Sequence, residues 1–143
     1  MKTFDTTTVG DVMHEGVVTC DVDEPLTGVA RTMLQRRIHC VVVWHEPATA
    51  SDPQLWGVVS DLDLVKVAAT EDTGARTAGG SAATPALMVT PEETVRRAAQ
   101  LMAEHEVAHL VVIDSETSRP VGVISTLDVA KAVSGTPGLA PAI

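Results

Sequence analysis

The most constraining feature of this chain is that it contains the same sequence twice. Residues 57–66 match residues 122–131, with Gly, Val, Ser, Leu, Asp and Lys recurring at an offset of 65. Upstream, residues 26–34 match residues 95–103 at an offset of 69. The larger upstream offset places a four-residue insertion in the first copy, and the Pro-, Ala- and Asp-rich residues 47–53 are its expected position. An internal repeat of this kind predicts two similar structural units.

Each copy predicts the same order of elements. Apolar side chains within residues 26–34 recur at i, i+3, i+4, i+7 and i+8, which predicts one face of a helix. The second copy repeats this pattern over residues 95–103, and Thr90, Pro91 and Glu93 predict where that helix begins. The other predicted elements are strands at 17–20 and 86–89, at 41–44 and 110–113, and at 55–59 and 120–124, and short helices that begin at Ser60 and Ser125.

The predicted fold class is α+β, with two β-α-β-β-α repeats. A unit of about 60 residues is marginally stable alone. We therefore expect the two repeats to pack sheet to sheet with pseudo-two-fold symmetry. The expected boundaries are residues 8–69 for the first repeat, an Ala-, Gly- and Thr-rich linker at 70–83, and residues 84–133 for the second repeat.

Charge and composition disfavour several classes of function. Ten Lys and Arg against nineteen Asp and Glu give a net charge of −9, which repels nucleic acids. One Phe, two Trp and no Tyr offer few surfaces on which bases could stack. No apolar run is long enough for a membrane span, and the N-terminus lacks a secretory signal. Two cysteines, Cys20 and Cys40, are expected to be reduced thiols in a cytoplasmic protein.

The repeated Gly-x-x-Ser-x-x-Asp pattern has two interpretations that the residues alone leave open. Ser60 with Asp63, and Ser125 with Asp128, have the spacing of a helix capping box. The same atoms could instead bind a nucleotide. A helix N-terminus and a Ser hydroxyl suit a phosphate, and an Asp carboxylate can accept both hydroxyls of a ribose.

These residues resemble a tandem pair of cystathionine β-synthase (CBS) domains, a Bateman module. The resemblance rests on the Gly-hydrophobic-hydrophobic-Ser-x-x-Asp pattern in both copies and on the opening residues 8–13, and it covers residues 8–133. The second copy lacks a recognisable opening motif within residues 78–84. The resemblance implies a stand-alone regulatory protein that is a homodimer and binds AMP, ADP, ATP or S-adenosylmethionine as a regulatory ligand. It implies no catalytic residues, no required cofactor, and a regulated partner that the sequence does not identify.

The resemblance also implies two clefts, each shared between the repeats. Residues expected around the first cleft are Asp63, Ser60, Val58, Thr84, Leu87 and His109. Residues expected around the second cleft are Asp128, Ser125, Val123, Thr8, Val18 and His39.

Two features bear on phosphate binding. Nucleotide-binding relatives often carry an Arg just before the middle strand, where this chain has His109 and Cys40, so the first cleft is expected to bind phosphate better. Lys66 and Lys131 could neutralise a phosphate or could pair with Asp63 and Asp128 along the helix.

Two alternative functions remain. Residues 105–109 match H-E-x-x-H, which would make the chain a zinc hydrolase if His105 and His109 lay one turn apart on a helix. The repeat instead predicts that the chain leaves the helix for a strand here, so we expect no metal site. The other alternative is a module without ligand that acts by dimerisation or by docking onto a partner protein.

Overall fold

The computed structural model describes residues 3–46, 54–70 and 74–135, which form two compact units. Unit 2 consists of Val18–Ala86, and unit 1 consists of Met1–Val17 together with Leu87–Ile143. The expected insertion at residues 47–53 lies outside the described residues. None of the helices in the described ranges is long and apolar enough to cross a bilayer. The elements in chain order are η1 (Phe4–Thr6), α1 (Val9–Val12), β1 (His14–Glu15), β2 (Thr19–Asp21), α2 (Leu26–Arg36), β3 (Cys40–His45), β4 (Gln54–Ser60), α3 (Asp61–Ala68), α4 (Ala78–Ser81), β5 (Met88–Val89), α5 (Val95–His105), β6 (His109–Ile113), β7 (Pro120–Ser125) and α6 (Thr126–Ser134).

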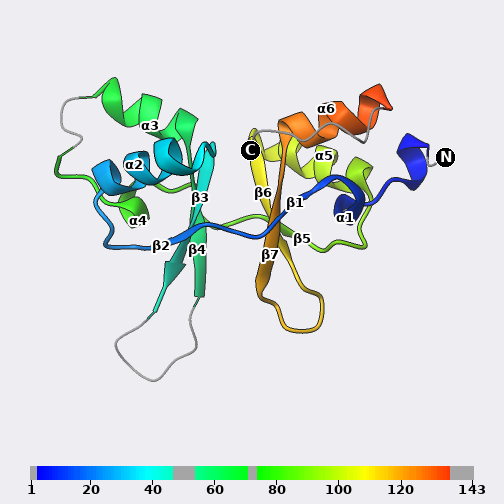
Figure 1. Ribbon diagram of the computed structural model, residues 1–143, viewed down its shortest axis with the longest axis horizontal. Coiled ribbons are helices and arrows are strands. Elements are labelled where there is room, and N and C mark those ends of the chain that lie inside the picture. Colours follow the sequence, from blue (N-terminus) through cyan, green and yellow to red (C-terminus); the bar gives the residue numbers. More distant parts are fainter. Residues whose placement is uncertain (1–2, 47–53, 71–73, 136–143) are drawn as a thin grey trace. The chain divides into compact units, whose positions relative to one another are not determined.

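Unit 2 is a three-stranded sheet in the order β2-β3-β4, packed against helices α2, α3 and α4 (Figure 1). Strand β2 runs parallel to β3, and β3 runs antiparallel to β4. Alternate strand residues point to opposite faces. One face therefore supplies the helix-side core, in which Val41, Val43 and Val59 pack with Leu26 and Val29 of α2.

Unit 1 is a four-stranded sheet in the order β1-β7-β6-β5, packed against helices α1, α5 and α6 (Figure 1). Its core repeats the arrangement of unit 2, with Leu110, Val112 and Ile124 packed against Val95 and Met102 of α5. The α+β fold class and the two repeats are thereby confirmed.

The two long helices, α2 and α5, match each other in length and in the way they end. Helices α2 and α5 each contain 11 residues, and each ends on a residue in the left-handed conformation, Arg37 and Glu106, both with φ 54°. The N–H of the next residue then bonds back to the carbonyl of Met33 at 3.0 Å or of Met102 at 3.1 Å. These contacts satisfy carbonyl groups at the helix end that would otherwise lack partners. The sequence does not reveal this ending, because neither residue is a glycine.

The segment expected to be a linker contains a helix that is equivalent to α1. Thr77 caps α4 as Thr8 caps α1, and the N–H groups of Gly79 and Gly10 both donate to carbonyls, of Val22 and Pro91, at 2.9 Å. Each residue of the second copy follows its counterpart by 69 positions: Thr77 follows Thr8, Gly79 follows Gly10, and Pro91 follows Val22. The second copy therefore has an opening segment after all, and it begins at Thr77, one residue before the range 78–84 in which the sequence showed no motif.

These opening helices are exchanged between the repeats. Helix α1 opens the first repeat in the sequence but packs in unit 1, where Val9 lies in the core with residues of the second repeat. Helix α4 precedes the second repeat but packs in unit 2, where Ala78 is fully buried. This exchange brings together segments that are far apart in the sequence, so local sequence patterns do not predict it.

Candidate functional site

The repeated Ser-x-x-Asp pattern forms the N-termini of α3 and α6. In unit 2 the backbone N–H of Ser60 donates to Asp63 Oδ2 at 2.8 Å, and the Ser60 hydroxyl donates to the same oxygen at 3.0 Å. In unit 1 the corresponding distances from Ser125 to Asp128 Oδ2 are 2.8 Å and 3.1 Å. The hydroxyl of each Ser also accepts from the backbone N–H of its Asp, at 3.4 Å and 3.3 Å. Both capping boxes are therefore formed.

The capping interaction uses only one of the two carboxylate oxygens. In both units Oδ2 is held by the Ser, which fixes the Asp side chain against the first turn of the helix. The capping and binding interpretations are consequently compatible, because Oδ1 can still accept hydrogen bonds from another molecule.

The two carboxylates differ strongly in their surroundings. Asp128 is 0% exposed, and its Oδ1 has no hydrogen-bond partner within the part of the chain that the structure describes. Burial raises the pKa of Asp128 above its ordinary value, while the hydrogen bonds from Ser125 and the charges of Lys131 and His14 oppose that rise. Asp63 is only half-buried. A buried acceptor without a partner costs about 1–3 kcal/mol, so Asp128 is the residue that requires an explanation.

The glycines of the motif serve backbone packing. A Cβ at Gly122 would lie 2.4 Å from the carbonyl oxygen of His14, and a Cβ at Gly57 would lie 2.4 Å from that of Ala83. In unit 1 the backbone of His14 lies too close to β7 for a side chain at position 122, and in unit 2 the backbone of Ala83 lies too close to β4 for a side chain at position 57. This contact accounts for both glycines without a ligand.

The first residue of each middle strand, β3 or β6, pairs with the capping Ser. His109 is the register partner of Ser125, and Cys40 is the register partner of Ser60. His39 is exposed and pairs through Nδ1 with Asp61 Oδ2 at 2.9 Å. In unit 2 a hydrogen bond on the surface, between His39 and Asp61, thus lies directly before β3.

The structure distributes the predicted site residues over the two units. Residues in unit 2 are Val18, His39, Val58, Ser60, Asp63 and Thr84. Residues in unit 1 are Thr8, Leu87, His109, Val123, Ser125 and Asp128. Within unit 1, His109, Val123 and Ser125 are brought together by the pairing of β6 with β7. Sequence reasoning missed His14, whose strand β1 is only two residues long.

The H-E-x-x-H residues do not lie on one helix. Helix α5 ends at His105, Glu106 is in the left-handed conformation, and His109 begins β6. The predicted change from helix to strand is confirmed, so the two histidines lack the spacing of a zinc-protease helix. Within residues 3–46, 54–70 and 74–135 no three His, Cys, Asp or Glu side chains form a group that could hold a metal ion.

Both cysteines are free thiols, as expected. Burial raises the pKa of Cys40 to about 12 and that of Cys20 to about 11, and nearby carboxylates add to both shifts. Because the thiolate is the reactive form, neither side chain is activated for chemistry.

Comparisons with known proteins agree with the two repeats seen in the structure. The CBS domain family model matches residues 9–70 and 82–135. Hypoxic response protein 1 of Mycobacterium tuberculosis is 30% identical over 127 residues, which cover 87% of this chain and 84% of that protein. A solved structure of Hypoxic Response Protein I contains two coordinated zinc ions; it is 28% identical with a TM-score of 0.68, and the match covers 87% of this chain and 98% of that chain.

Two further structures share the fold. A CBS domain pair in complex with 5′-methylthioadenosine and S-adenosyl-L-methionine has a TM-score of 0.77 and 18% identity over 91% of this chain and 98% of that one. The CBS domain of a bacterial CNNM/CorC family Mg²⁺ transporter in complex with ATP has a TM-score of 0.73 and 20% identity over 92% and 90% of the two chains. Since the family model covers most of the sequence, this chain belongs to the CBS domain family and carries two CBS domains in tandem.

Proposed function

We propose that this CBS pair is a regulatory protein that binds an adenosine-containing ligand at the N-terminus of α6. The carboxylate of Asp128 is the proposed anchor, and it accepts hydrogen bonds from the two ribose hydroxyls. The observation that carries this proposal is the buried Asp128 Oδ1 that has no hydrogen-bond partner among the described residues.

The chemistry of a ribose fits this carboxylate. A diol donates two O–H groups to one acceptor group, which supplies the missing partner of Oδ1 and stabilises the charged form of Asp128. Each charge-assisted hydrogen bond contributes about 1.5–3 kcal/mol, so one such bond alters affinity by about tenfold or more.

The family supports the ligand class. Proteins of this fold have been solved with ATP, and with 5′-methylthioadenosine and S-adenosyl-L-methionine. The proposed ligands are accordingly AMP, ADP, ATP or S-adenosylmethionine, acting as regulators. The sequence predicted that phosphorylated ligands would prefer the cleft of Asp63, because His109 was expected there. The burial of Asp128 leads us to propose Asp128 as the anchor instead.

Calorimetric titration with these four compounds tests the proposal. We expect at least one to bind the wild-type protein and to lose about tenfold or more in affinity with Asp128→Asn, which keeps the size and the cap of the side chain. Asp63→Asn is the matched control and should change the affinity less. Binding that is unaffected by Asp128→Asn would refute the ribose role, and the lack of binding by all four would refute the function.

A second candidate function is homodimerisation or protein docking, and exposed apolar side chains favour it. On α3, Leu62 is 51% and Val65 is 61% exposed, and on α6, Leu127 is 49% and Val133 is 69% exposed. Leu62 and Leu127 occupy equivalent positions of the two helices, and exposed apolar side chains of this kind are suited to a contact with a second copy of this chain.

The oligomeric state tests this second candidate. Light scattering should give twice the 15.0 kDa mass of the chain for the wild type and the monomer mass for Leu62→Glu. Leu34→Glu is a suitable control, because Leu34 is also exposed but lies on α2. A wild-type monomer at high concentration would exclude the homodimer.

A further inference from the structure

We propose that His14 is a specificity-determining residue of the Asp128 site, and that its protonated imidazole selects phosphate-bearing adenosine ligands over uncharged ones. This inference rests on the proposed function, because it concerns which adenosine ligand the Asp128 site accepts. It adds a residue that neither the sequence patterns nor the Ser-x-x-Asp motif indicates.

The first step is the position of His14 on the sheet. His14 is the antiparallel partner of Val123, and partners in adjacent strands carry their side chains on the same face. Ser125 follows Val123 by two residues and therefore points to that face as well. The core residues Leu110, Val112 and Ile124 occupy the opposite face, toward the helices. Strand pairing thus places His14 on the side of the sheet that carries the capping Ser.

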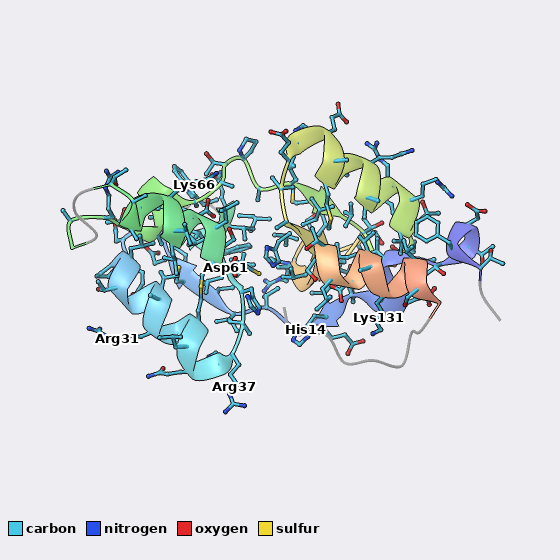
Figure 2. All side chains as sticks on the ribbon, turned by 90° about the horizontal axis from the view of Figure 1, so that it is seen from above. His14, Arg31, Arg37, Asp61, Lys66 and Lys131 are labelled. Atoms are coloured by element: carbon cyan, nitrogen blue, oxygen red, sulfur yellow. The ribbon has the colours of Figure 1, made fainter. Side chains whose placement is uncertain are left out.

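The second step is the charge environment. His14 interacts electrostatically with Asp128, as does Lys131 from the next turn of α6. In the view of Figure 2, the labelled His14 and Lys131 lie on the same side of α6. Among the other titratable groups nearby, His109 shares the sheet face through its pairing with Ser125, Glu15 follows His14 on β1 and is exposed, and Asp11 of α1 accepts from the N–H of Thr8 at 2.9 Å.

The third step is a comparison with the other repeat. The position equivalent to His14 in unit 2 is Ala83, which bridges to Val58 as His14 pairs with Val123. The position equivalent to His109 is Cys40, whose thiol is neutral because burial raises its pKa to about 12. The backbone of the two sites is the same, but an ionisable imidazole at the edge strand occurs in unit 1 alone of the two described units.

These observations determine the expected selectivity. A ribose held by Asp128 leaves its 5′ substituent near the first turn of α6, where the helix dipole favours an anion. The N–H groups of Thr126 and Asp128 already donate to the Ala108 carbonyl and the Ser125 hydroxyl, so a side-chain cation is the remaining partner for a phosphate. A protonated imidazole carries a positive charge, and a lower pH favours this form. Since His14 is half-buried, its charge is less screened than that of an exposed group. A ligand phosphate gains from that charge, whereas adenosine, which carries no phosphate, does not.

Calorimetry with AMP and adenosine at about pH 6 and about pH 8 tests this inference. The measured quantity is the ratio of the AMP affinity to the adenosine affinity. At pH 6 we expect His14→Gln to lower this ratio by about fivefold relative to wild type, and at pH 8 to leave it nearly unchanged. The phosphate itself changes charge near about pH 6, so the comparison is made between proteins at one pH. His105→Asn is the control, because it removes an exposed histidine of unit 1 that ends α5.

The possible outcomes distinguish a failure of the His14 inference from a failure of the proposed adenosine site. Equal ratios in wild type and His14→Gln at both pH values would overturn the role of His14 while leaving the adenosine site intact. An equal fall of the ratio in His105→Asn would overturn it too, because the effect would then come from net charge. If wild type binds neither compound at either pH, the inference and the proposed function both fail.

Discussion

Replacement of Asp128 by Asn should make the protein more stable while it weakens ligand binding. Asp128 is 0% exposed, and its Oδ1 lacks a hydrogen-bond partner among the described residues. An ionised carboxylate in this position is costlier than a neutral amide. The amide oxygen can still accept from Ser125, and the amide nitrogen replaces Oδ1 as the atom without a partner among the described residues, so the difference between the two side chains is the buried charge. Relief of the buried charge contributes about 1–3 kcal/mol, and loss of the favourable helix-dipole interaction costs about 0.3–1 kcal/mol. We therefore expect a net gain of about 1 kcal/mol in the free energy of unfolding at neutral pH.

The pH dependence follows from the raised pKa of Asp128. Because burial places the folded-state pKa of Asp128 above its ordinary value of 3.8, the folded protein holds this proton more tightly than the unfolded chain. The penalty is absent below the unfolded-state pKa and develops as the pH rises through the folded-state pKa. Wild type and Asp128→Asn should thus have similar stability in acid and should diverge toward neutral pH.

Urea unfolding followed by circular dichroism at about pH 4 and about pH 7.5 measures this difference. Asp63→Asn is the matched control at the equivalent position of unit 2, and we expect it to lower the stability slightly, since Asp63 is half-buried and loses only its dipole interaction. A loss of stability in Asp128→Asn at neutral pH, equal to that in Asp63→Asn, would refute the reasoning. It would show that Asp128 is an ordinary capping residue.

Two other predictions concern packing and the thiols. Gly122→Ala should lower the free energy of unfolding by about 1–3 kcal/mol, because its Cβ would lie 2.4 Å from the backbone oxygen of His14. Gly28→Ala on α2 should instead raise the free energy of unfolding by about 0.5–1 kcal/mol, since its Cβ meets only the end of the flexible Glu24 side chain. Urea unfolding of both glycine variants measures these changes, and equal changes in the two would contradict the prediction. Because burial raises the pKa of Cys40 to about 12, its thiol should react with a disulfide reagent at neutral pH only after unfolding, and rapid labelling of the native protein would contradict that.

Local patterns predicted the repeated elements well. The spacing of apolar residues placed the two long helices, because burial of one helix face leaves a period that the sequence shows directly. The start of α5 was predicted too early. Thr90 and Glu93 do interact, with the N–H of Thr90 donating to Glu93 Oε2 at 2.7 Å, but they form a turn before the helix, whose N-cap is Thr94.

The features that the sequence concealed depend on contacts between distant segments. The exchange of α1 and α4 between the repeats involves hydrogen bonds such as Val9 N–H to Glu93 O at 2.8 Å, which join residues more than eighty positions apart. The matched Thr8 and Thr77 indicated that the opening segment recurs, which is visible only when the offset is applied to the whole chain, but they did not indicate in which unit each segment packs.

The difference between the two carboxylates was equally concealed. Asp63 and Asp128 occupy identical motifs, and local capping geometry is the same for both. Only the packing around α6 makes Asp128 fully buried, and only the pairing of β1 with β7 brings His14 to its side of the sheet. Burial is a property of the folded chain, so a repeat in the sequence cannot reveal that its two copies differ in this way.

The most direct test of the account is the carboxyl NMR signal of Asp128 in protein labelled at the aspartate side chains, recorded while AMP, ADP, ATP or S-adenosylmethionine is added. Because a ribose that donates to Oδ1 stabilises the charged form, the account predicts that a binding ligand moves the Asp128 signal and shifts its titration to lower pH. The Asp63 signal should change less. If a ligand binds with no change in the Asp128 signal or its titration, or if none of the four binds, the proposed site is contradicted.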